Sequence, residues 1–202
     1  MFKLHYLPGA CSISPHIALR EAGLPFELIE RNSAKARNQV SGDAIDPFQR
    51  TSQVPALVLP DGQLLTEGAV ILQYIADQNP DAKLLPTVGS FARVRAQEWL
   101  NFMATELHKA MAPFRMQEAN AEFKEALKRR LIPCYEHVAQ GLGSGPYLMG
   151  EEFTVVDCYA LYNIRSYRRF LGPELPVALA QYYERIVARP CVKAAFDAEG
   201  IE

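Results

Sequence analysis

The hydrophobic pattern of this 202-residue chain changes at one short segment, 79–86, which holds two prolines. Before it, short runs of alternating apolar and polar residues favour strands, and helical patterns separate them. After it, apolar residues recur only at helical spacing. Because prolines interrupt regular structure, the segment is the best candidate for a linker. The change predicts an α/β domain over 1–80 and an all-helical domain over 88–202.

The first domain is predicted to hold a mixed sheet of four strands. A helix joins the first two strands, which makes them parallel, and a turn at 60–62 joins the last two as a hairpin. The expected strands and helices are strand 2–7, helix 14–22, strand 26–30, strands 55–59 and 63–66, and helix 68–77.

The second domain is predicted to be a helical bundle. Pro133 should kink the second of its helices, because proline lacks the N–H that a helix interior needs. Thr154 and Asp157 have the spacing of a capping box, which starts the third. The expected helices are 90–116, 122–140, 154–170, 175–188 and 191–198.

Composition excludes several classes of function. The chain is 49% hydrophobic and 22% charged, which is typical of a globular protein. Its net charge is −2 without a basic run, so neither nucleic acid nor a membrane surface is an expected partner. No signal-peptide or membrane-spanning run is found. The four cysteines are far apart, which favours free thiols in a reducing cytoplasm.

Cys11 lies between the first predicted strand and the first predicted helix. Pro8 and Gly9 end the strand, and Ser14 followed by Pro15 is a good helix start. A thiol at a helix start feels unpaired N–H groups and the positive end of the dipole, both of which favour the reactive thiolate. The alternative is a buried cysteine that packs as a small apolar residue.

This order of elements resembles the thioredoxin fold, in which the reactive thiol follows the first strand. In the motif 11–14, Cys-Ser-Ile-Ser, serine takes the second cysteine position, so no internal disulfide can form. A single thiol needs an external thiol partner for a redox cycle, and glutathione is the obvious cytosolic one.

Two further features suit glutathione. A cis bond between Val54 and Pro55 would turn the Val54 backbone outward to pair with an extended peptide, although X-Pro bonds are seldom cis. The N–H groups after Glu67, at the start of a helix, can bind a carboxylate, while Glu67 can hold an ammonium. The alternatives are a strand-start proline and a glutamate that favours the helix dipole.

Taken together, the motifs resemble the bacterial beta-class glutathione transferases over nearly the whole chain. The matching stretches are 8–12, 16–21, 53–57, 65–68, 73–77, 98–102, 105–109, 153–157 and 198–201. The cysteine segment and the run Thr-Glu-Leu-His-Lys at 105–109 are the most specific to that class.

The resemblance implies a role for individual residues. Cys11 contacts the sulfur of glutathione and can form a mixed disulfide with it, and the Val54 backbone pairs with its cysteinyl part. Glu67 and Gly68 hold the γ-glutamyl end, and Tyr6 has a minor catalytic role. The other expected glutathione-binding residues are Lys35, Gln53, Asn101, Thr105, Glu106, Leu107 and His108. Helix faces and the resemblance together assign the electrophile pocket to Lys109, Phe114, Tyr162 and Arg165.

The chain departs from the family pattern in two places. Gly68 stands where serine is often found, so a hydroxyl contact is lost while the backbone N–H remains. Residues 49–52, Gln-Arg-Thr-Ser, replace a common Asn-Pro-Lys-Gly. The glycyl carboxylate of glutathione then has Lys35, Arg37 or Arg50 as its candidate partner.

The expected activity is transfer of glutathione to a hydrophobic electrophile. Cys11, the adjacent helix start and His108 would stabilise the glutathione thiolate, and helix-end donors and a cation could supply that stabilisation. The alternatives are glutathione-dependent disulfide exchange through Cys11 and a non-enzymatic carrier of apolar ligands. The family also implies a homodimer, with glutathione as co-substrate and no permanently bound cofactor. His5 and His16 have no partner at metal-ligand spacing and are expected to be packed or solvated.

Overall fold

The computed structural model describes residues 1–31, 54–116, 120–172 and 174–201. The chain divides into two compact units, Met1–Leu84 with Pro190–Glu202, and Leu85–Arg189. The last helix was expected in the helical domain, whereas the structure groups it with the first unit.

The first unit contains the predicted mixed sheet of four strands, in the order β2-β1-β3-β4. β1 pairs with β2 in parallel, Phe2 opposite Phe26, and with β3 in antiparallel fashion, Leu4 opposite Leu57. Alternation along β1 buries Phe2, Leu4 and Tyr6, as a strand with one buried face requires. The strands are β1 (Phe2–Tyr6), β2 (Phe26–Glu30), β3 (Ala56–Val58) and β4 (Leu64–Leu65).

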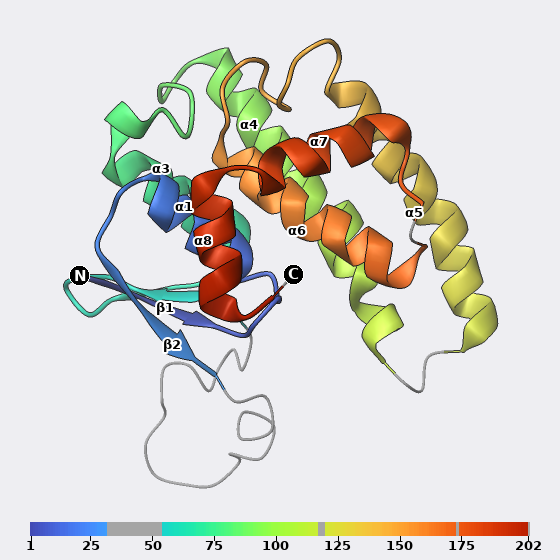
Figure 1. Ribbon diagram of the computed structural model, residues 1–202, viewed down its shortest axis with the longest axis horizontal. Coiled ribbons are helices and arrows are strands. Elements are labelled where there is room, and N and C mark those ends of the chain that lie inside the picture. The colour runs from blue at the N-terminus through green and yellow to red at the C-terminus, as the bar shows by residue number, and fades with distance from the viewer. Residues whose placement is uncertain (32–53, 117–119, 173, 202) are drawn as a thin grey trace, which may run out of the picture. The chain divides into compact units, whose positions relative to one another are not determined.

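Three α-helices of the described residues accompany this sheet. α1 (Ile13–Glu21) contacts both α3 (Gly68–Gln78) and α8 (Pro190–Glu199) (Figure 1). Gly23 adopts a φ of +63° just after α1, as expected from its place at the end of the helix. The short 3-10 helix η2 (Pro80–Ala82) follows α3.

The second unit is helical, as predicted. Thr154 and Asp157 form the expected capping box at the start of α6, and the hydroxyl of Tyr135 donates to the carbonyl of Asn163 and so joins α5 to α6. Its elements are α4 (Phe91–Phe102), η3 (Met103–His108), η4 (Lys109–Arg115), α5 (Ala121–Gly141), α6 (Val155–Phe170) and α7 (Val177–Val187).

The first helix of this unit is less regular than predicted. A single helix was expected over 90–116, but α4 passes into a π-helical turn at η3 and then a 3-10 segment at η4. Pro113 lies inside η4, where a regular α-helix would lose a hydrogen bond. π-helical turns often occur at functional sites, and η3 contains four of the expected site residues. No helix of the described residues is long and apolar enough to cross a bilayer.

Candidate active site

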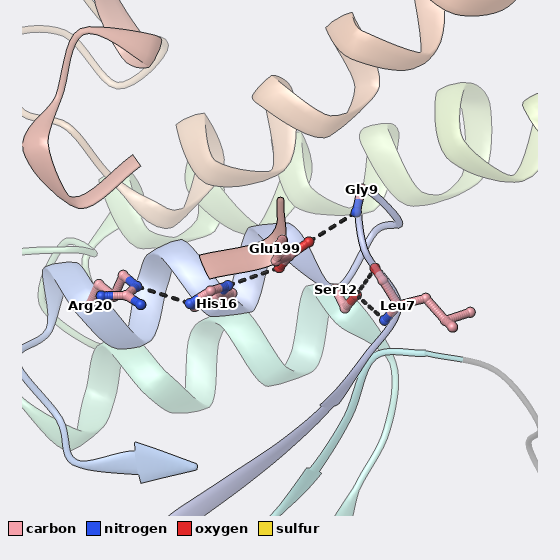
Figure 2. Close-up of polar contacts among 6 residues, drawn as sticks. All are labelled: Leu7, Gly9, Ser12, His16, Arg20 and Glu199. Carbon is pink, nitrogen blue, oxygen red and sulfur yellow. Dashed lines mark hydrogen bonds and ion pairs between the residues drawn. The ribbon is translucent and has the colours of Figure 1, made fainter. Parts of the chain in front are cut away.

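Cys11 follows a tight turn between β1 and α1. The turn is closed by a hydrogen bond of 3.0 Å from the Ala10 N–H to the Leu7 carbonyl. The hydroxyl of Ser12 bonds both the N–H and the carbonyl of Leu7, each at 3.2 Å (Figure 2). The backbone that carries the thiol is therefore fixed on both sides, and Cys11 itself is 9% exposed.

The Cys11 thiol donates a hydrogen bond of 3.0 Å to the Val54 carbonyl. The Val54–Pro55 peptide bond is cis, the geometry that would turn the Val54 backbone outward. A thiolate has no proton to donate, so this contact belongs to the protonated thiol.

The start of α1 differs from the prediction. Ser12 is the N-cap residue, not Ser14, and its side chain makes no capping bond because Leu7 engages it. The Ile13 and Ser14 N–H groups donate to the carbonyls of Ala10 and Cys11. Those two N–H groups therefore do not serve the sulfur, and the helix dipole remains the source of the expected preference for thiolate. The buried Ser14 hydroxyl has no hydrogen-bond partner among the described residues.

Glu67 and Gly68 form the start of α3. Glu67 has a φ of +67°, a strained conformation for a residue with a side chain, and such strain is concentrated at functional sites. The N–H of Gly68 has no acceptor within the helix. An exposed carboxylate thus lies beside a helix start that can receive an anion.

These two parts of the first unit are connected. A Cβ placed on Gly68 would lie 3.6 Å from Cγ of Pro55, and Pro55 follows the residue that accepts the Cys11 hydrogen bond. Cys11, Val54, Pro55 and Gly68 are therefore neighbours in space. The structure brings together four of the predicted site residues of this unit: Cys11, Val54, Glu67 and Gly68.

The remaining predictions in the first unit are weaker or lie outside the described residues. Tyr6 is buried, and its pKa is raised by this burial and by Glu30, to which its hydroxyl is bonded. The Tyr6 hydroxyl is thus a weak proton donor. The predicted partners of the glycyl carboxylate, Lys35, Arg37 and Arg50, lie outside the described residues. The altered loop at 49–52 and the predicted glutathione-binding residue Gln53 lie outside them too.

In the second unit, η3 places its predicted residues in different environments. The Thr105 hydroxyl donates to the Asn101 carbonyl at 3.1 Å, and Thr105 is exposed. Glu106 is paired with Arg130 at 2.9 Å. Leu107 is 1% exposed, so only its backbone is a plausible ligand contact.

His108 is held by aromatic residues. Its Nδ1 lies 2.8 Å from the hydroxyl of Tyr159, and its ring packs edge-on against Tyr162 at 4.8 Å. Burial, Arg115 and Lys109 lower the pKa of His108 to about 4. His108 is therefore neutral at pH 7, so it is not the cation that would stabilise a thiolate.

The predicted electrophile-pocket residues lie on η4 and α6. The ring of Phe114 stacks near that of Phe170 at 6.3 Å. The buried hydroxyl of Tyr162 accepts a hydrogen bond from Arg115, and Arg165 donates to the Tyr183 hydroxyl at 3.4 Å, while Lys109 is exposed.

Tyr159 was not identified from the sequence. Its position three residues before Tyr162 on one helix could have indicated it, because residues at that spacing share a helix face. Within the described ranges, no group of three or more His, Cys, Asp or Glu side chains could hold a metal ion.

Comparisons with known proteins identify the class to which this geometry belongs. The family described as "Glutathione S-transferase, N-terminal domain" matches residues 10–78, and "Glutathione S-transferase, C-terminal domain" matches 105–198. Glutathione S-transferase GstA of Escherichia coli O157:H7 is 39% identical over 201 residues, which cover 99% of this chain and 100% of that protein.

Solved structures agree. The ternary complex of BphK, a bacterial GST, has a TM-score of 0.90 at 40% identity and covers 98% of this chain and 100% of its own. The bacterial beta-class glutathione S-transferase of Sphingomonas chungbukensis has a TM-score of 0.86 at 36% identity and covers 99% and 100%. The chain therefore belongs to the glutathione S-transferase family. It is a transferase with the architecture and motifs of the beta class, as its sequence predicted.

Proposed function

We propose that the protein conjugates glutathione to small hydrophobic electrophiles, with detoxification as the outcome. One observation carries the proposal: the Cys11 thiol, the cis Val54–Pro55 backbone and the helix start at Gly68 are contiguous in space. Together they offer a contact for the sulfur, the peptide backbone and the α-carboxylate of glutathione. The comparisons name transferases and favour neither disulfide exchange nor ligand carriage.

Each end of glutathione has a candidate partner in this arrangement. Its γ-glutamyl carboxylate would accept from the Gly68 N–H at the start of α3, and the exposed Glu67 carboxylate would pair with the ammonium on the same carbon. The backbone of Val54 would pair with the cysteinyl residue. Cys11 would then face the glutathione sulfur. Lys35 is proposed to meet the glycyl carboxylate, and Gln53 is proposed to contribute to glutathione binding.

The reaction needs the glutathione thiolate. The thiol loses its proton, its sulfur attacks the electrophilic carbon, and the leaving group departs with the bonding electron pair. The imidazole of His108 is neutral at pH 7, but its lowered pKa makes it a weak base for a thiol proton, so that proton passes to solvent. We assign His108 a hydrogen-bonding contact with the bound substrates in place of charge stabilisation. Tyr6, with its raised pKa, has a minor role.

The second unit is proposed to supply the remaining contacts. Asn101, Thr105, Glu106 and the Leu107 backbone would assist in binding glutathione. Aromatic side chains suit a hydrophobic electrophile, since binding sites for small molecules are mostly apolar with few polar groups. The residues assigned to this role are Lys109, Phe114, Tyr162 and Arg165.

We further propose a cytoplasmic homodimer. Phe91 is 70% exposed and Val94 52%, and their spacing on α4 puts both on one helix face. Large apolar side chains exposed together often mark an interface. All four cysteines are thiols, which suits a reducing compartment. Sedimentation equilibrium should give twice the chain mass, and a monomer at micromolar concentration would contradict the dimer.

The deciding experiment is glutathione-dependent conjugation of 1-chloro-2,4-dinitrobenzene, assayed in parallel with reduction of a mixed disulfide of glutathione. We expect conjugation by the native protein and its loss in Cys11→Ala, with Cys134→Ala as the matched control. No conjugation while glutathione still binds would overturn the proposed activity. Conjugation that survives Cys11→Ala would show that glutathione is activated without this cysteine.

A further inference from the structure

A series of polar contacts, buried at its centre, joins α8 to the turn that precedes Cys11 (Figure 2). Nε of Arg20 lies 2.9 Å from Nε2 of His16, and Nδ1 of His16 lies 2.8 Å from Oε1 of Glu199. The other carboxylate oxygen, Oε2, accepts the N–H of Gly9 at 2.9 Å. The side chains of His16 and Glu199 are both 0% exposed, so the contact between them is closed to water, while the contacts of Arg20 and Gly9 at the two ends are part-buried.

The direction of every hydrogen bond in this chain is fixed by Arg20. A guanidinium Nε–H donates and never accepts, so Nε2 of His16 must carry the lone pair. The ring proton therefore lies on Nδ1 and is donated to Glu199. The backbone N–H of Gly9 is also a donor. Two donors thus converge on residue 199, and only an ionised carboxylate presents an acceptor to both.

The Glu199 end of this hydrogen-bonded series contacts the backbone next to the proposed site. Gly9 has a φ of +66°, and a Cβ there would lie 3.5 Å from Cγ2 of Ile201. The turn is therefore held by the hydrogen bond that the Gly9 N–H donates to Glu199, and Ile201 lies beside it. Cys11 follows two residues later.

We propose that Arg20, His16 and Glu199 are positioning residues that form a one-way hydrogen-bond relay. In this relay, Arg20 sets the tautomer of His16. An ionised carboxylate at position 199 is then necessary to hold the Gly9 turn for Cys11. The functional part of this inference rests on the proposed role of Cys11. The relay itself stands on the contacts alone.

The relay makes an unusual prediction about pairs of substitutions. In Glu199→Gln the amide has one accepting oxygen and one donating NH2 group. The oxygen can serve the N–H of Gly9 or that of His16, so the other N–H meets the NH2 group, which is also a donor. Arg20→Gln places an amide group at the position of Nε, because the two side chains have the same length up to that atom. This amide can donate or accept, so the single substitution leaves the relay complete.

In the double variant the relay can reverse. The amide at position 199 accepts from Gly9 and donates to Nδ1 of His16, whose proton moves to Nε2 and is accepted by the amide at position 20. Arg20→Gln should therefore repair the defect of Glu199→Gln. Arg20→Met with Glu199→Gln is the matched control, since it removes the same two charges but has no amide oxygen to accept the His16 proton.

Two measurements test the relay. Nitrogen-15 NMR of the imidazole reports which ring nitrogen of His16 carries the proton, and we expect Nδ1–H in the native protein and Nε2–H in Arg20→Gln/Glu199→Gln. Steady-state kinetics should show a glutathione KM raised about tenfold in Glu199→Gln, with a smaller change in kcat, and restored to within about twofold in that double variant. Arg95→Met, which breaks an exposed pair with Glu98, controls for loss of an arginine elsewhere.

The outcomes separate the relay from the proposed function. An Nε2–H tautomer in the native protein overturns the relay, as does equal rescue of Glu199→Gln by Arg20→Met and Arg20→Gln. If Glu199→Gln does not fold, recovery of folding by Arg20→Gln but not Arg20→Met gives the same answer. If the protein proves inactive with glutathione, the tautomers and the rate of Cys11 alkylation, followed by mass spectrometry of its peptide, still test the relay.

Discussion

The thiol of Cys11 is hydrogen-bonded to the carbonyl of Val54, 43 residues away in the sequence. The bond links the turn after β1 to the residue before the cis proline, so the two backbone segments proposed to meet glutathione stabilise each other. Cys11 therefore has a structural role besides its chemical one, and substitutions can separate the two.

Cys11→Ser and Cys11→Ala should differ in glutathione binding. Serine retains a donor to the Val54 carbonyl, whereas alanine leaves that carbonyl without one, which costs about 1 kcal/mol for a neutral hydrogen bond. We expect titration calorimetry to give near-native glutathione affinity for the serine variant and affinity weakened about fivefold for the alanine variant. Equal affinities would show that the Val54 contact does not organise the site.

Glu67→Gly should improve stability while it impairs binding. Glycine adopts a positive φ without strain, and relief of the strain at Glu67 should raise the free energy of unfolding by about 1 kcal/mol in urea titrations. The glutathione KM should rise because the ammonium loses its partner. Lys83→Gly is the control, since Lys83 has a φ of +53°, and it should gain stability with an unchanged KM.

Gly68→Ser should restore the hydroxyl that the family pattern leads us to expect. A Cβ at Gly68 would meet Pro55 at the ordinary contact distance of 3.6 Å, so the larger residue fits. We expect the KM for glutathione to fall about threefold, through one added hydrogen bond to the γ-glutamyl carboxylate. Gly68→Ala separates this effect from helix propensity, and an equal fall in both variants would rule out the hydroxyl contact.

Acid should destabilise the protein through His108. Its pKa falls from 6.5 to about 4 on folding, so between these values the unfolded chain binds more protons than the folded one. Stability is fully present above pH 6.5 and is lost as the pH falls toward 4, by up to about 3 kcal/mol. In urea unfolding at pH 7 and pH 4.5, His108→Gln should lose less stability than the native protein. The exposed His137→Gln should behave like the native protein.

Local patterns were sufficient to predict the strands and the capping box of α6. They failed at Ser14, because the helix already begins at Ile13, where backbone hydrogen bonds from Ile13 and Ser14 to the turn before it start the helix without a side-chain cap. The pairing of His16 with Glu199, 183 residues apart, has no local signal. The neutral state of His108 arises from burial and from nearby cations, which spacing along the chain does not reveal.

The grouping of α8 with the first unit has a consequence for the order of synthesis. A ribosome makes residues 1–84 first and Pro190–Glu202 only after the whole helical unit. The contacts of Glu199 with the N–H of Gly9 and the ring of His16 therefore cannot form through more than half of translation. Amino-terminal domains commonly fold as they emerge, but here the first unit can complete its structure only after the second has been made.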